Sequence, residues 1–231
     1  MNMGLVINPR GTSGAGKTWL VRQVMAEYGG DRVEAVPLLR AGRRRPMGWR
    51  LSRLGGGRPL AVNGHYEATR GGADTIPEAD GGMDEAVRLA DTLASEGHDV
   101  LLEGLQFSGD VERTAALARA QRARDSELHV LCLDVPLDRC IRNVMVRRRA
   151  GRSARPAIER TARAGAVAME TACEALRQHG VDVQRLSLDA ALVRIRGLLG
   201  LGHAVGPRAN LPAPPSIGWG WIAATRASCP V

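Results

Sequence analysis

The chain has 231 residues and a mass of 24.7 kDa, and 44% of its residues are apolar, which suits one domain with a sizeable core. Only 3% are aromatic, so the core must rely on Leu, Val, Ile and Ala, as in a parallel sheet covered by helices. The formal charge of +8 favours a polyanionic partner such as nucleic acid, or a phosphate-rich substrate. A compositional bias toward arginine explains that charge equally well.

The cysteines and the N-terminus favour an intracellular compartment. The four cysteines show no C-x-x-C spacing, and three of them lie in apolar, regular segments, so we expect buried free thiols in a reducing compartment. No signal peptide is evident, and no stretch approaches the ~20 apolar residues of a membrane helix. These observations predict a cytoplasmic protein.

Strand-like and helical patterns alternate along the chain. Apolar runs predict five strands, over residues 3–7, 33–36, 100–102, 128–133 and 181–186. Helical spacing predicts six helices, over residues 18–28, 83–96, 110–124, 137–149, 156–179 and 188–199. This alternation predicts an α/β fold with a doubly wound, mostly parallel five-stranded sheet that binds its ligands at the carboxyl ends of the strands.

Two stretches interrupt the alternation. Residues 40–81 are rich in arginine and glycine and show little periodicity, so we interpret them as a substrate-binding excursion within a domain of residues 1–200. Residues 201–231 contain several prolines, glycines and tryptophans, which predicts an irregular tail.

A glycine-rich motif follows the first predicted strand and opens the first predicted helix. The octet fits G-x-x-x-x-G-K-[ST], the phosphate-binding P-loop, and reads Gly11-Thr12-Ser13-Gly14-Ala15-Gly16-Lys17-Thr18. Its backbone N–H groups would surround phosphate oxygens at the positive end of the helix dipole. Lys17, the chain's only lysine, would reach the β- and γ-phosphates of ATP, and Thr18 would hold Mg²⁺ directly.

A carboxylate ends the third predicted strand, where Glu103 is followed by Gly104. In a parallel sheet this position faces the glycine loop. Glu103 is therefore a candidate to hold Mg²⁺ through water, or to accept the proton of an attacking hydroxyl. The alternative is an exposed glutamate at a strand end.

Arginines are dense between residues 142 and 155, after the turn at Pro136. We interpret residues 147–156 as a lid that closes over a transferred phosphoryl group, with Arg147, Arg148 and Arg152 as the catalytic candidates. A solvated basic helix face is the alternative.

A polar loop between residues 63 and 75 contains the candidates for binding the acceptor, which are His65, Tyr66, Glu67, Arg70 and Asp74. Tyr66 could stack on a base, Arg70 could bind a phosphate, and Glu67 or Asp74 could orient a hydroxyl. Each of them could equally belong to an ordinary polar surface loop.

Together, the glycine motif, the Glu103-Gly104 strand end, the Asp134-to-Leu137 turn and the arginine lid resemble the P-loop kinases of the thymidylate kinase superfamily, over about residues 3 to 199. The loop from Gly64 to Thr75 is more similar to a phage branch that includes kinases of 5-hydroxymethyluracil in DNA. The resemblance implies a phage-encoded enzyme of the host cytoplasm, with ATP and Mg²⁺, that converts the base in DNA to 5-phosphomethyluracil during thymidine hypermodification.

One departure argues against a thymidylate substrate. Glu103, Gly104 and Leu105 stand where thymidylate kinases carry an acidic residue paired with arginine. A hydroxyl acceptor gains from a base such as Glu103, whereas an already ionised phosphate gains little. A kinase of a free nucleoside or nucleoside monophosphate, and a non-catalytic ATP-dependent switch, remain the alternatives.

Overall fold

The structure is a computed structural model that describes residues 3–29, 35–43, 45–53, 56–66 and 71–201. All of these residues lie within one compact unit, Met1–Leu201. Two of the candidate residues, Glu67 and Arg70, lie outside the described residues, as does the predicted irregular tail beyond Leu201.

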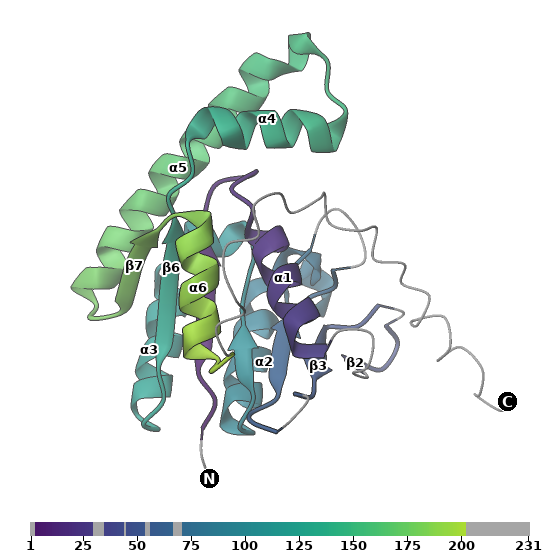
Figure 1. Ribbon diagram of the computed structural model, residues 1–231, viewed down its shortest axis with the longest axis vertical. Coiled ribbons are helices and arrows are strands. Elements are labelled where there is room, and N and C mark those ends of the chain that lie inside the picture. The colour runs from purple at the N-terminus through teal and green to yellow at the C-terminus, as the bar shows by residue number, and fades with distance from the viewer. Residues whose placement is uncertain (1–2, 30–34, 44, 54–55, 67–70, 202–231) are drawn as a thin grey trace, which may run out of the picture. The chain divides into compact units, whose positions relative to one another are not determined.

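The described residues form one mixed, mostly parallel sheet of seven strands in the order β2-β3-β4-β5-β1-β6-β7 (Figure 1). The strands are β1 Val6–Arg10, β2 Ala35–Leu38, β3 Gly48–Leu51, β4 Leu60–Asn63, β5 Asp99–Leu101, β6 Leu128–Leu133 and β7 Asp182–Leu186. β4, β5, β1, β6 and β7 pair in parallel, whereas β2, β3 and β4 pair antiparallel at one edge.

The α/β class and the mostly parallel sheet are confirmed, but the prediction of five strands is wrong. The two additional strands, β3 and β4, lie inside the excursion 40–81, which is thus partly sheet. Each has four residues and begins or ends close to a glycine, so neither shows the alternation that would reveal it. Antiparallel pairing across short connections then gives the sheet its mixed character.

The described part contains six α-helices, all close to their predicted positions. They are α1 Lys17–Gly29, α2 Gly82–Ser95, α3 Glu112–Arg122, α4 Leu137–Arg148, α5 Arg155–Gln178 and α6 Leu188–Leu198. α4 packs against α5 beyond the sheet, whereas the other helices cover its two faces (Figure 1). α2, α3 and α5 share one hydrophobic core with the strands, while α1 and α6 pack together on the other face. None of the described helices is long and apolar enough to cross a membrane.

The central strand β1 carries an unusual buried arginine. Arg10 is fully buried, and its guanidinium donates to Asn8 Oδ1 (2.8 Å), to the backbone carbonyl of Asp110 (2.6 Å) and to Thr114 Oγ1 (2.6 Å). Burial lowers the pKa of Arg10 to about 10, partly offset by Asp110. This network ties β1 to the start of α3, directly before the glycine loop.

The prediction of free thiols is wrong for two cysteines. Cys132 of β6 and Cys173 of α5 are joined by a disulfide across the interface between the sheet and the helix. Their separation of 41 positions in the sequence gives no signal of the pairing, because the pairing depends on how α5 packs on the sheet. Cys140 is free and buried, as predicted, and Cys229 lies outside the described residues.

Candidate active site

Three loops meet at one edge of the sheet. β1 and β4 both flank β5 in parallel, so the segments that follow these strands leave the sheet on the same side. The segments are the glycine loop after β1, the stretch 64–75 after β4, and Glu103 after β5. The fold therefore gathers most of the described candidate residues around a single place.

The glycine loop connects β1 to α1, which begins at Lys17. Gly14 and Gly16 have φ values of 87° and 96°, a region that favours glycine, and a Cβ on Gly14 would lie 2.2 Å from the carbonyl oxygen of Cys140. Lys17 is buried, and its Nζ donates to the backbone carbonyls of Gly11 (2.5 Å) and Thr12 (3.4 Å). Burial lowers the pKa of Lys17, while the nearby Glu103 carboxylate opposes that effect.

Glu103 is not an exposed strand-end residue, because only 2% of it is accessible. The Tyr66 hydroxyl donates to its Oε2 at 3.4 Å, and the Thr18 hydroxyl lies 3.5 Å from both carboxylate oxygens. Burial raises the pKa of Glu103 to about 7, although Lys17 and the two hydroxyl groups lower it. A carboxyl group with this pKa changes its charge near neutral pH.

The stretch 64–75 packs tightly around Glu103. Gly72 has a φ of 82°, and a Cβ there would lie 2.4 Å from both the carbonyl oxygen and Oε2 of Glu103. A Cβ on Gly71 would come within 3 Å of Tyr66 and Thr18. The backbone N–H of Ala73 donates to the Glu103 carbonyl at 2.6 Å. The glycines of this loop are thus required for its close approach to the carboxylate.

The candidate acceptor-binding residues that are described support this arrangement. Tyr66 is fully buried, so in this structure it has no exposed face to stack on a base, and burial raises its pKa well above the ordinary value. Asp74 accepts hydrogen bonds from the backbone N–H groups of Leu105 (2.5 Å) and Gln106 (3.2 Å), which fixes the turn after Glu103. His65 is also buried, and its backbone N–H donates to Thr75 Oγ1.

The predicted lid consists of the end of α4, the 3₁₀ turn Arg152–Ala154 and the start of α5. One of its three catalytic candidates reaches the glycine loop, since Arg147 Nη2 donates to Ser13 Oγ at 3.0 Å. Arg148 and Arg152 are exposed and make no hydrogen bond or ion pair with any residue that the structure describes. In this conformation only Arg147 is placed near the loop.

Three residues near the site had no signal in the sequence. Ser108 Oγ lies 3.0 Å from the Gly11 carbonyl and also accepts from the Gly11 N–H. Asn143 of α4 donates to the Gly14 carbonyl at 2.9 Å, and Arg22 of α1 donates to the Tyr66 carbonyl at 2.7 Å. None of the three belongs to a motif, because each is brought in by packing. Thr12 of the glycine motif makes a further contact of this kind, since its Oγ1 donates to the Ala162 carbonyl of α5 at 2.8 Å.

Fold and site together define an α/β protein whose polar groups converge on a glycine loop at the carboxyl ends of parallel strands. No family model matches the chain. Over 195 residues, 84% of the chain, it is 35% identical to the 5-hmdU DNA kinase of Pseudomonas phage PaMx11, and the match covers 96% of that protein. The chain therefore belongs to the family of this phage kinase, as the resemblance predicted, and is a phosphotransferase.

Proposed function

We propose that this protein transfers a phosphoryl group from ATP to the hydroxymethyl oxygen of 5-hydroxymethyluracil in DNA, giving 5-phosphomethyluracil. The named activity of the phage PaMx11 relative supports this proposal. Within the structure, the observation that carries it is the buried Glu103 beside Thr18 and the glycine loop.

Glu103 is suited to activate a hydroxyl acceptor. A hydroxyl group holds its proton at neutral pH, so its attack on phosphorus is helped by a positioned base whose pKa lies near the working pH. Burial raises the pKa of Glu103 to about 7. In the proposed step the hydroxymethyl oxygen bonds to the γ-phosphorus, the bond from that phosphorus to the bridging oxygen of ADP breaks, and the hydroxyl proton passes to the Glu103 carboxylate.

The glycine loop and Lys17 are suited to hold the donor. Lys17 is a buried cation whose hydrogen bonds go to two uncharged backbone carbonyls, so a polyphosphate would provide anionic acceptors that these carbonyls do not. The backbone N–H groups of residues 11–18 would bind the phosphate oxygens. These residues fit a nucleoside triphosphate.

Oxygen donors beside the loop fit Mg²⁺. The Thr18 hydroxyl would bind the ion directly and Glu103 through water, a donor set of the kind Mg²⁺ uses together with substrate phosphates. When bound, Mg²⁺ would neutralise charge on the phosphates. Arg147, held against Ser13, would stabilise the phosphoryl group as it moves.

The proposal also covers the chain's organisation and setting. Residues 1–200 would form the kinase domain, with residues 40–81 on the acceptor side and residues 147–156 as the lid. Arg148 and Arg152 would join Arg147 at the phosphoryl group only if the lid moves. His65, Glu67, Arg70 and Asp74 remain candidates for contact with the acceptor. The enzyme would act where phage DNA and ATP are present, in the host cytoplasm.

An acceptor screen tests this function. Purified protein with γ-labelled ATP and Mg²⁺ should label duplex DNA that contains 5-hydroxymethyluracil, while a thymine-containing duplex of the same sequence stays blank. Labelling of free nucleosides or nucleoside monophosphates alone would instead establish the small-substrate alternative. ATP hydrolysis with no labelled acceptor would favour the switch.

A further inference from the structure

The positive charge of this chain is concentrated in two segments. Residues 137–163, which form α4, the turn after it and the first part of α5, contain nine arginines against two carboxylates. This segment therefore has a net charge of +7 in 27 residues, and residues 40–58, with seven arginines and no carboxylate, have the same net charge. A general bias toward arginine would spread the surplus along the chain, so the charge needs a local explanation.

Most arginines of residues 137–163 have no counter-charge among the residues that the structure describes. Six of them are exposed and make no hydrogen bond or ion pair with any described residue, namely Arg139, Arg142, Arg148, Arg149, Arg152 and Arg160. Two others pair with the segment's two carboxylates, Arg155 with Asp138 and Arg163 with Glu159. Clustered like charges without partners repel one another, which favours binding of a polyanion.

The two faces of α4 differ in what they contact. Asn143 and Arg147 point to the glycine loop, and Cys140 and Val144 are buried. Arg139 and Arg142 lie on the exposed side, and Arg149 follows at the exposed end of the helix, where α4 and α5 project beyond the sheet (Figure 1). In the described part of the chain, none of these three arginines has a hydrogen bond or ion pair to the glycine loop, whereas Asn143 and Arg147 do.

Arg139 in particular does not serve the stability of its own helix. It lies in the first turn of α4, next to Asp138, where the positive end of the helix dipole disfavours a cation. Arg149, at the other end of α4, is favoured by the dipole but has a φ of 49°, which is uncommon for a residue other than glycine.

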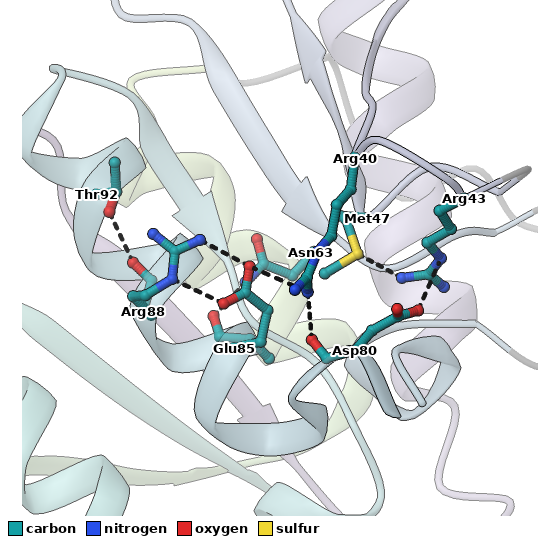
Figure 2. A network of polar contacts seen from close by, with 9 residues as sticks. Arg40, Arg43, Met47, Asn63, Asp80, Glu85, Arg88 and Thr92 are labelled. Carbon is teal, nitrogen blue, oxygen red and sulfur yellow. Dashed lines mark hydrogen bonds and ion pairs between the residues drawn. The ribbon is translucent and has the colours of Figure 1, made fainter. Parts of the chain in front are cut away.

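The described arginines of residues 40–58 are in a different situation. Arg43 pairs with Asp80 (Figure 2) and also donates to the carbonyl of Thr75. Arg50 pairs with Glu96, and Arg58 pairs with Asp99. Arg40 donates to the Asp80 carbonyl at 2.6 Å. These side chains hold the loops of the acceptor side together, and their charges are largely compensated. They are a weaker candidate for an external polyanion.

We propose that the outer surface of the α4–α5 hairpin, defined by Arg139, Arg142 and Arg149, binds the phosphate backbone of the DNA that carries the target base. This inference rests on the proposed function and adds the surface through which the polymer is held. Guanidinium groups bind phosphate oxygens without reading sequence, so the surface would position the duplex and leave base recognition to the site.

The test compares two triple variants that change charge equally. R139Q/R142Q/R149Q removes the proposed surface, and R113Q/R119Q/R122Q removes three exposed arginines of α3. Affinity for a duplex with 5-hydroxymethyluracil is measured without ATP over a range of salt concentrations. Each lost phosphate contact reduces the slope of log Kd against log salt by about 0.9. We expect R139Q/R142Q/R149Q (the α4 triple) to lose about 2 to 3 units of this slope and R113Q/R119Q/R122Q (the α3 triple) to keep the wild-type slope. The charge-preserving variant R139K/R142K/R149K should restore the slope.

Phosphorylation assays separate this proposal from the function on which it rests. The R139Q/R142Q/R149Q variant should raise KM for the duplex tenfold or more and raise it far less on a trinucleotide, which has too few phosphates to engage all three arginines. Equal effects of the two triples, or a wild-type slope in the α4 triple, would refute the surface while wild-type phosphorylation continues. Failure of the wild-type protein to phosphorylate either substrate would refute the function itself.

Discussion

The hydroxyl of Tyr66 donates a hydrogen bond to Oε2 of Glu103 at 3.4 Å, and both side chains are buried. Tyr66 lies in the stretch after β4 and Glu103 just after β5, so the contact joins the segments that follow two neighbouring strands, at the edge of the sheet where the glycine loop lies. A buried carboxylate needs such donors, because each one replaces part of the hydration that burial removes. Tyr66 thus has a role in setting the charge of Glu103.

Replacement of Tyr66 by Phe should shift the pH dependence of the reaction. The variant removes a donor that lowers the pKa of Glu103, so that pKa rises above about 7 and less carboxylate is present at neutral pH. We expect kcat at pH 7 to fall severalfold and to recover as pH increases. The pH profile of kcat measures this shift.

The chain's other described tyrosine provides the control for that variant. The Tyr28 hydroxyl donates to the carbonyl of Arg58 at 3.3 Å, away from Glu103. Tyr28→Phe should leave the pH profile unchanged. If Tyr66→Phe and Tyr28→Phe give the same profile, Tyr66 has no influence on the base.

Glu103→Gln should separate activity from stability. As a base, Glu103 must be ionised, so wild-type activity should decline as pH falls below about 7, and the variant should lose on the order of a hundredfold or more in kcat. A small loss in kcat would mean that Glu103 only shapes the turn.

The same variant should unfold less readily at high pH. The folded-state pKa of Glu103 is raised, so the stability present below its usual pKa of 4.5 is lost as pH rises through about 7. Glutamine carries no charge to bury and should raise the free energy of unfolding by about 1 to 3 kcal/mol at pH 8, with little gain at pH 4. Urea denaturation at the two pH values measures the difference.

The helices and the position of Glu103 could be predicted from the sequence. Apolar residues at helical spacing define all six helices, and a glutamate that ends a parallel strand must lie at the edge where the glycine loop lies. Both inferences use local patterns. The resemblance placed the chain in its family for the same reason, since it rested on short contiguous motifs.

The contacts that hold Glu103 in place could not be predicted from local patterns. Tyr66 precedes Glu103 by 37 positions, with α2 and β5 between them, and the loop that contains Tyr66 has no periodicity to show which side chains turn inward. Asp74 had the appearance of an acceptor-binding group, yet it caps the turn after Glu103 through the backbone N–H groups of Leu105 and Gln106. A polar residue in a glycine-rich loop is equally suited to both roles until the packing is known.

Gly72 offers a test of that packing. Alanine at this position combines an unfavourable φ of 82° with a Cβ only 2.4 Å from Glu103 Oε2. Gly42→Ala is the matched control, because Gly42 has a φ of 78° but no atom within 4 Å of a Cβ. We expect a destabilisation of about 2 to 4 kcal/mol for Gly72→Ala and about 1 to 2 kcal/mol for Gly42→Ala. Thermal unfolding measures both.

The kinetic effects of the two glycine variants should differ more strongly. Gly72→Ala must displace the carboxylate or the loop, so its kcat should fall at least tenfold in the fraction that remains folded. Gly42→Ala should retain wild-type kcat. Equal kcat in the two variants would contradict the view that the loop fixes Glu103.

Lys17→Met tests the donor side of the site. Methionine has nearly the shape of lysine but no charge, so phosphates would lose their buried cationic partner, and both ATP binding and turnover should fall by a factor of a hundred or more. Burial lowers the pKa of Lys17, so the folded state disfavours the charged form of its side chain. The free-energy cost of burying this charge is greatest at pH values below the lowered pKa. Lys17→Met removes that cost, so the variant should be at least as stable as wild type at pH 7. If the variant is inactive and also less stable, the hydrogen bonds of Lys17 to Gly11 and Thr12 hold the loop together. If the variant retains activity, the assignment of the loop to ATP is refuted.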